Sequence, residues 1–115
     1  MNNLEKNEDE DLKWRKYVNK KLKKNYKELF SIIDHYIFMK IPNFNTVLKW
    51  RLLQENKLKK KSHLKKNIMS YSEIKRFIMF YQRITLQMIK DLSKSASVVM
   101  FMKKNHKVEK VLFRK

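Results

Sequence analysis

Residues 70–92 read SYSEIKRFIMFYQRITLQMIKDL, and this stretch contributes most to the expected fold. Ser70, followed three positions later by Glu73, is a capping-box pattern, which is typical of the start of a helix. The apolar and aromatic residues that follow recur at helical spacing. They are Ile74, Phe77, Ile78, Tyr81, Met88, Ile89 and Leu92. We therefore expect a long helix that is covered on more than one side.

Two further helices are expected on the N-terminal side of this stretch. Apolar residues spaced by four, three, four and four positions form one stripe, which predicts a helix over residues 12–39. The stripe consists of Leu22, Tyr26, Leu29, Ile33 and Ile37. Pro42 is expected to end this helix, because proline cannot continue the backbone hydrogen bonds. The apolar residues at 44–53 predict a second helix that follows it.

Turn chemistry favours helices over strands throughout the chain. Its 115 residues include no glycine and one proline. Tight hairpin turns depend strongly on glycine, whereas helices tolerate its absence. We therefore expect an all-α fold, a three-helix up-down-up bundle over residues 12–102. A disordered acidic tail is expected at 1–11 and a flexible basic tail at 103–115.

Charge is the strongest compositional signal. The chain has 29 lysines and arginines against 11 acidic residues, a net charge of +18. Residues 1–12 hold five of the acids and one base, so the remaining chain carries 28 bases and 6 acids. Self-repulsion of this size is relieved by an acidic partner. The candidate partners are nucleic acid, an anionic membrane and an acidic protein.

Two lysine-rich stretches, 20–27 and 57–66, are candidates for contacts with phosphates. The alternative is a solvated helix face, in a chain whose lysine, asparagine and isoleucine content is typical of AT-rich coding. No aromatic residues alternate with these lysines in the pattern of a known nucleic-acid module. The solvated face is therefore the slightly better interpretation, and both remain open.

Several classes of function lack the residues that they require. The absence of cysteine excludes a disulfide scaffold, a cysteine-ligated zinc and a thiol nucleophile. His35, His63 and His106 are not spaced as metal ligands, and the acids outside the N-terminal segment are isolated from one another. The apolar runs are too short to span a bilayer. We expect no catalytic residue, no metal site, no cofactor of the chain's own and no transmembrane segment.

Three short segments resemble the LYR-motif superfamily, which consists of small basic three-helix mitochondrial proteins. NYKELF at 25–30 is similar to the family's opening Leu-Tyr-Arg or Leu-Tyr-Lys motif, without its leading leucine. LQENK at 53–57 is similar to Phe-Arg-Glu-Asn-Lys, and SYSEI at 70–74 is similar to Asp-Pro-x-Glu-Ile. The similarity covers residues 22–101, with a lysine-rich insertion near 58–66.

The resemblance implies a non-catalytic adaptor of the mitochondrial matrix that binds acyl carrier protein. In this family, basic side chains hold the acidic carrier, and its acyl-phosphopantetheine chain lies between the helices. The implied carrier-binding residues are Tyr26, Lys27, Lys49 and Arg51. The implied acyl-chain tunnel is lined by Leu29, Ile33, Phe77, Ile78 and Tyr81.

The resemblance also implies a client for the adaptor. The segments are most similar to those of the subunit that stabilises the cysteine desulfurase of iron–sulfur cluster assembly. Because residues 86–101 are similar to the LYR subunit of respiratory complex I, a subunit or assembly factor of that complex is the alternative. Outside the family, the charge is compatible with a basic RNA- or ribosome-associated protein without specific DNA recognition, or with a peripheral membrane protein.

Overall fold

The longest helix is the one that the capping-box pattern predicts. The structure, a computed structural model, describes residues 1–61 and 68–114, and helix α5 spans Tyr71–Ser95. The Ser70 hydroxyl accepts a hydrogen bond from the backbone N–H of Glu73, and the Glu73 carboxylate accepts one from the N–H of Ser70 at 2.7 Å. The bond from the Ser70 N–H lowers the pKa of Glu73 below its ordinary value. The predicted start of the helix is therefore confirmed.

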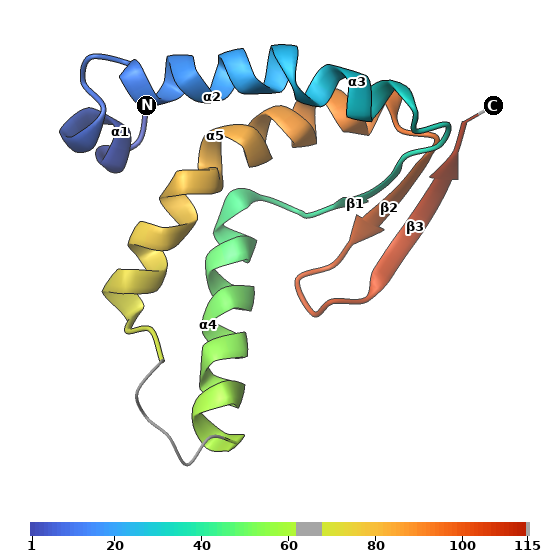
Figure 1. Ribbon diagram of the computed structural model, residues 1–115. Helices are drawn as coiled ribbons and strands as arrows, with labels where there is room; N and C mark the ends of the chain where they lie inside the picture. The colour runs from blue at the N-terminus through green and yellow to red at the C-terminus, as the bar shows by residue number, and fades with distance from the viewer. Residues whose placement is uncertain (62–67, 115) are drawn as a thin grey trace.

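Helix α4 (Phe44–Lys61) runs antiparallel to the first half of α5, which confirms the second predicted helix (Figure 1). Ile74 and Ile78 of α5 are buried and lie one turn apart. Glu55 of α4 is also buried, and its carboxylate lies 2.6 Å from the Arg51 guanidinium. The same carboxylate accepts a hydrogen bond from the backbone N–H of Met69. This buried pair fastens the chain just before α5 to the middle of α4.

The helix expected over residues 12–39 is wrong in its last part. Helix α2 (Lys13–Lys24) and helix α3 (Tyr26–Ser31) lie end to end, because Asn25 between them keeps a right-handed helical conformation (Figure 1). Strand β1 (Ile37–Lys40) then follows. Its residues continue the apolar stripe in sequence, but β-branched and aromatic side chains also suit a strand that finds a pairing partner.

A three-stranded sheet makes the fold mixed α/β, so the all-α three-helix bundle is wrong. Strands β2 (Val98–Met102) and β3 (Val108–Phe113) complete the order β1-β2-β3. β1 pairs with β2 in parallel, and β2 pairs with β3 in antiparallel. A parallel pair requires a long crossover connection, which α4 and α5 provide.

The β2–β3 hairpin forms without glycine, which is why the turn argument failed. Within the turn, Lys103 N–H donates to the Lys107 carbonyl at 2.8 Å and His106 N–H donates to the Lys103 carbonyl at 3.1 Å. His106 adopts the left-handed conformation, with φ of 66°, that a glycine usually occupies. Its ring stacks on Trp50 of α4 with 4.4 Å between the ring centroids. This contact compensates for the unfavourable backbone conformation.

Both ends of the chain contain regular structure, contrary to the expected flexible tails. Helix α1 (Asn3–Glu8) lies within the acidic segment and packs on α5. Strand β3 lies within the basic C-terminal segment. Both segments were expected to be flexible because their composition is highly charged, yet charge partners and strand pairing order them.

A small core joins the sheet to the end of α5. Phe38 of β1 and Val99 of β2 are register partners, and both pack against Ala96 just after α5. Arg114, just after β3, donates to the carbonyls of Ser93 and Ala96 at 2.7 and 3.0 Å. These carbonyls belong to the C-terminal end of α5, where a cation is favoured. Arg114 therefore anchors the edge strand to the helix.

We expect Arg114→Ala to lower the free energy of unfolding by about 2 kcal/mol, because two charge-assisted hydrogen bonds are lost. Urea denaturation followed by circular dichroism measures this loss. Arg114→Lys is the matched control, since it keeps the charge but has one donor nitrogen in place of the two that Arg114 uses. It should have a smaller effect. Equal stability of the alanine variant and the wild type would show that the anchor contributes nothing.

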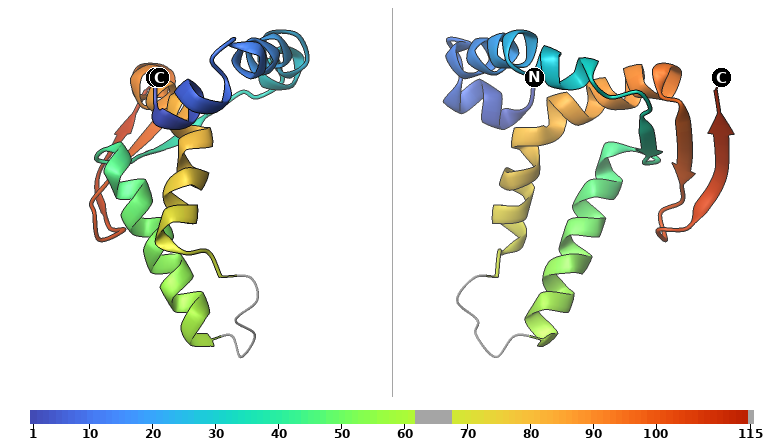
Figure 2. Two further views of the ribbon diagram at one scale, coloured as in Figure 1. Left: turned by 90° about the vertical axis from the view of Figure 1, so that its left-hand side faces the viewer. Right: turned by 45° about the vertical axis from the view of Figure 1, so that its right-hand side comes forward.

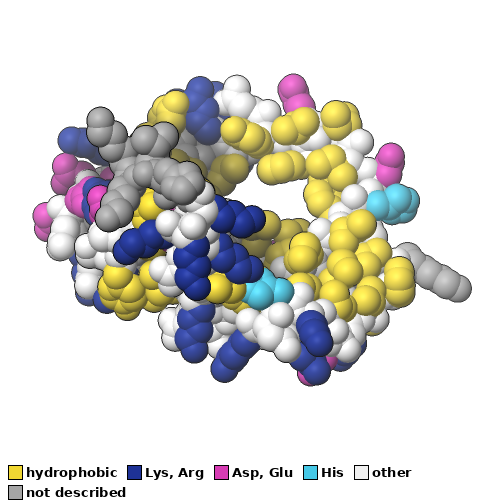
Figure 3. Space-filling model, turned by 90° about the horizontal axis from the view of Figure 1, so that it is seen from below, with side chains coloured by type: hydrophobic (Ala, Val, Ile, Leu, Met, Phe, Trp, Pro, Cys, Tyr) yellow, Lys and Arg dark blue, Asp and Glu magenta, His cyan; other side chains and the backbone are white. Residues whose placement is uncertain are grey.

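The molecule is open and leaves much apolar surface uncovered. Its radius of gyration is 16.9 Å, against about 13 Å for a compact domain of this length. Its accessible surface is 9781 Å², against about 6,800 Å² for a compact monomer of this mass. Hydrophobic side chains surround a hollow in the molecule, and α2 stands apart from the sheet (Figures 2 and 3). Much of the apolar surface is therefore not covered by the chain itself.

Candidate functional site

Five exposed lysines form one continuous face along α2 and α3. Their spacing of four, three or four residues places them on the same side of the helix. We call this face the lysine ridge; it consists of Lys16, Lys20, Lys23, Lys24 and Lys27. The ridge is about 16 Å long at the ordinary rise of a helix. No acidic residue occurs between positions 12 and 27, and the nearest one after the ridge is Glu28 of α3, one turn beyond Lys24.

The two kinds of basic residue have different roles in the structure. Four arginines form ion pairs with carboxylates, and the fifth, Arg114, binds main-chain carbonyls. Among the described lysines, only Lys13 is in an ion pair, with Asp11, and both side chains are exposed. The arginines hold the fold together, and the lysines leave their charge at the surface.

The acidic N-terminal segment fastens helix α2, and with it the lysine ridge, to α5. Glu5 accepts two hydrogen bonds from Arg83 at 2.7 and 2.8 Å, and Glu8 accepts two from Arg76 at 2.8 and 2.6 Å. Asn2 caps α1 and donates to the carbonyl of Met79 at 2.9 Å. Three points of α5 thus hold α1 in place.

Asp9 connects α1 to the first turn of α2. Its carboxylate accepts hydrogen bonds from the backbone N–H groups of Trp14 and Arg15 at 2.8 and 3.1 Å, which serves as a cap for α2. The Arg15 side chain donates to the same carboxylate at 2.8 Å. The bond from Arg15 lowers the pKa of Asp9, and the bond from Arg83 lowers the pKa of Glu5. The acidic residues of this strongly basic chain therefore hold α1 and α2 in place.

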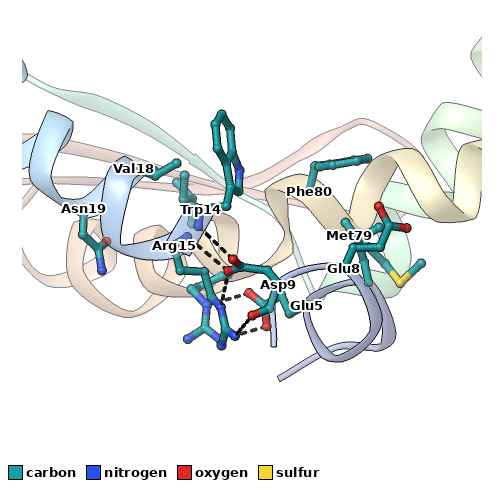
Figure 4. A pocket seen from close by; sticks show the side chains of 12 residues that line it. Glu5, Glu8, Asp9, Trp14, Arg15, Val18, Asn19, Met79 and Phe80 are labelled. Carbon is teal, nitrogen blue, oxygen red and sulfur yellow. Dashed lines mark hydrogen bonds and ion pairs between the residues drawn. The ribbon is translucent and has the colours of Figure 1, made fainter. Parts of the chain in front are cut away.

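A cavity of about 240 Å³ lies between α1, α2 and α5 (Figure 4). Trp14 and Val18 of α2 face it from one side, and Met79 and Phe80 of α5 face it from the other. The carboxylates of Glu5 and Asp9 close one end through the bonds described above. The apolar side of α2 is thus turned toward α5, and the lysine ridge lies on the opposite side of the helix.

The ion pair between Glu5 and Arg83 predicts that the stability of the protein depends on pH in the acid range. Because folding lowers the pKa of Glu5 from its ordinary 4.5, its contribution is complete above that value and is lost as pH falls below it. We expect Glu5→Gln to lower the thermal midpoint at about pH 6 and to have a progressively smaller effect as pH falls below 4.5. Thermal unfolding of both proteins across this range tests the expectation. A difference in midpoint that stays constant with pH would contradict it.

A scan against protein-family models, a search of curated proteins and a search of solved structures found no match to the chain. The LYR-motif resemblance is therefore neither supported nor opposed by a relative.

The four carrier-binding residues implied by the resemblance lie on two separate elements. Tyr26 and Lys27 begin α3 and are exposed, and Lys49 is exposed on α4. Arg51 is engaged inside the protein: it pairs with Glu55, and its guanidinium carbon lies 5.6 Å from the Phe77 ring centroid. Lys27 belongs to the lysine ridge, whereas Arg51 is committed to the contact between α4 and α5.

The five predicted tunnel residues also divide between two elements. Leu29 belongs to α3 and Ile33 follows it, and both are exposed. Phe77 and Tyr81 of α5 are exposed, with their ring centroids 5.3 Å apart, and Ile78 between them is buried. The apolar stripe of the first predicted helix is therefore largely uncovered. Its role as a tunnel stays a prediction.

Sequence reasoning located part of the ridge and missed the residues that position it. The stretch at 20–27 includes four of its five lysines, and the spacing of Lys16 would have added the fifth. The stretch at 57–66 lies partly outside the described residues, and its described lysines are exposed at the end of α4. The ion pairs of Glu5 with Arg83 and of Glu8 with Arg76 have no sequence signature, because they depend on where α1 docks on α5.

Two further observations bear on the expected absences. Among residues 1–61 and 68–114, no group of three or more histidine and acidic side chains is arranged to hold a metal ion. Within the same described part, no helix has the length and hydrophobicity to cross a membrane.

Proposed function

We propose that this protein is a non-catalytic RNA-binding component of a larger assembly, and that the lysine ridge contacts RNA phosphates. The observation that carries the proposal is the ridge itself: five exposed lysines on one helix face, with no described ion pair among them. Lysines on a rigid helix hold charge in a fixed row without specifying a base sequence. The proposal develops the RNA-associated alternative that the charge predicts.

The geometry of the ridge suits a phosphate backbone. Its length of about 16 Å spans many charges of a duplex, which carries one about every 1.7 Å of its axis. Each contact releases condensed counterions, so affinity is expected to fall steeply with salt. Double-stranded RNA is recognised largely through its shape and through contacts to 2′-hydroxyls and phosphates, and exposed lysines can make the phosphate contacts.

The open shape supports a role inside an assembly. The apolar face of the sheet that points away from α5 is exposed at Ile37, Met39, Val111 and Phe113. A surface of this kind is unusual in a free monomer. The adaptor role implied by the resemblance relied on a three-helix bundle, and without that bundle we base the proposal on the lysines instead.

The test compares three anionic partners for the wild-type protein at equal concentrations. A short RNA duplex, acyl carrier protein and vesicles containing phosphatidylserine represent the three classes of partner. We expect the duplex to bind most tightly, with log affinity falling against log salt with a slope of about −4.5 for five contacts. A DNA duplex of equal length measures any preference for RNA.

Each other outcome replaces the proposal with a different one. Tight binding of acyl carrier protein without binding of the duplex at about 50 mM salt would favour the adaptor. Flotation of the folded protein with vesicles, without binding of the duplex, would favour a peripheral membrane protein.

A further inference from the structure

A second basic site lies on the sheet, far from the ridge in sequence. Lys40 of β1, Phe101 of β2 and Lys110 of β3 are register partners and form one row across the three strands. The ammonium groups of Lys40 and Lys110 lie 5.2 and 4.7 Å from the centroid of the Phe101 ring. Two cations therefore flank one half-buried aromatic ring, an arrangement that attracts negative charge next to an apolar face.

A groove of about 540 Å³ begins at this row and extends along the hairpin turn. Lys40 and Phe101 line its start, and Lys103 and Lys104 line the turn. Lys110 lies beside the Phe101 ring, just outside this lining. Glu109 is the only acidic residue in the lining. The groove thus combines one aromatic ring with several positive charges.

The turn that bounds the groove is held rigidly by helix α4. The Trp50 indole N–H donates to the Lys104 carbonyl at 2.8 Å, and the Trp50 ring stacks on His106. The lysines of the turn therefore project from a fixed backbone. A site built on such a frame binds an extended ligand without first ordering the protein.

We propose that this groove binds a single-stranded segment of RNA, with one base stacked on Phe101 and the adjacent phosphates held by Lys40 and Lys110. The inference extends the proposed function, because it assumes that the protein binds RNA. Single-strand sites combine a basic groove with aromatic rings on which bases stack. When phosphates draw the two ammonium groups away, the face of the ring becomes free for a base. A duplex keeps its bases paired and offers none to the ring.

The test measures the binding of a ten-nucleotide single-stranded RNA and of a ten-base-pair RNA duplex by fluorescence anisotropy. Phe101→Leu keeps an apolar side chain at the core and is expected to weaken single-strand binding about tenfold while leaving duplex binding within twofold. Lys40→Gln with Lys110→Gln does not alter the core and is expected to weaken single-strand binding similarly. In that variant the slope of log affinity against log salt should become shallower by about 1.4. Lys75→Gln with Lys90→Gln is the matched control.

The outcomes separate this inference from the proposed function. Unchanged single-strand affinity in both the Phe101 and the Lys40/Lys110 variants overturns the groove site, even if ridge variants weaken the binding of both RNAs. If the wild-type protein binds neither the single strand nor the duplex, both the proposed function and the groove site are overturned. A loss confined to single strands in both variants supports the site.

Discussion

Replacing Lys16, Lys20 and Lys23 together by glutamine is expected to weaken RNA duplex binding by about 100- to 1,000-fold. Each substitution removes one charge-assisted contact of about 1–1.5 kcal/mol, and about 1.4 kcal/mol corresponds to tenfold in affinity. Glutamine retains helix propensity and length, so α2 should stay intact. The slope of log affinity against log salt should become shallower by about one for each lysine removed. Anisotropy titrations at several salt concentrations measure both quantities.

The matched control removes the same charge from another helix. Lys75, Lys90 and Lys94 are exposed on α5 and are spread along its length. Their replacement by glutamine lowers the net charge equally but leaves the ridge complete, so we expect at most a severalfold loss. If the two triple variants lost affinity to the same extent, net charge and not the ridge would explain the binding.

The second large effect is expected in the fold. Ile74 is 1% exposed and lies in the first turn of α5, on the part of the helix that runs beside α4. Ile74→Ala should lower the free energy of unfolding by about 3 kcal/mol, because it removes buried methylene and methyl groups and leaves a cavity. Only seven hydrophobic residues are buried in the described part of the chain, so few other side chains contribute to the core. Chemical denaturation measures the loss.

Ile32→Ala is the control with identical chemistry. Ile32 is 74% exposed just after α3, so its replacement should change the free energy of unfolding by less than about 0.5 kcal/mol. A large loss at Ile32 would mean that this surface is covered in solution, for example by a second copy. A small loss at Ile74 would contradict the core described for α4 and α5.

Helices α4 and α5, which form the crossover connection, could be predicted from the sequence because their signals are local. Ser70 and Glu73 cap α5 through neighbouring atoms, and the apolar spacing after them continues for the length of the helix. Pro42 marks the boundary before α4 in the same way. Signals of this kind do not depend on what the rest of the chain does.

The strands could not be predicted because their partners are distant in the chain. Ile37 lies four residues after Ile33 and so continues the apolar spacing of a helix, yet it pairs with Val98. The hairpin turn uses His106 in a conformation that usually indicates glycine. The structures predicted from local sequence patterns were therefore wrong for both segments, because pairing between strands outweighs helical spacing.

The candidate site shows the same division between local and distant signals. The lysine ridge follows from spacing along a single helix and is visible in the sequence. Its orientation depends on Asp9, which caps α2 and binds Arg15, and on Glu5, which holds Arg83. These carboxylates are shielded, with side-chain exposures of 11% and 12%, although their sequence context is typical of a solvated tail. Tertiary docking decides their role.

The most direct measurement of the central claim is the rate of lysine acetylation along the chain, with and without a saturating RNA duplex. Mass spectrometry resolves the ridge peptides from those of α5. The account predicts that the duplex slows acetylation of Lys16, Lys20, Lys23 and Lys27 several-fold and leaves Lys75, Lys90 and Lys94 unchanged. Equal protection of both sets, or protection of α5 alone, would contradict it.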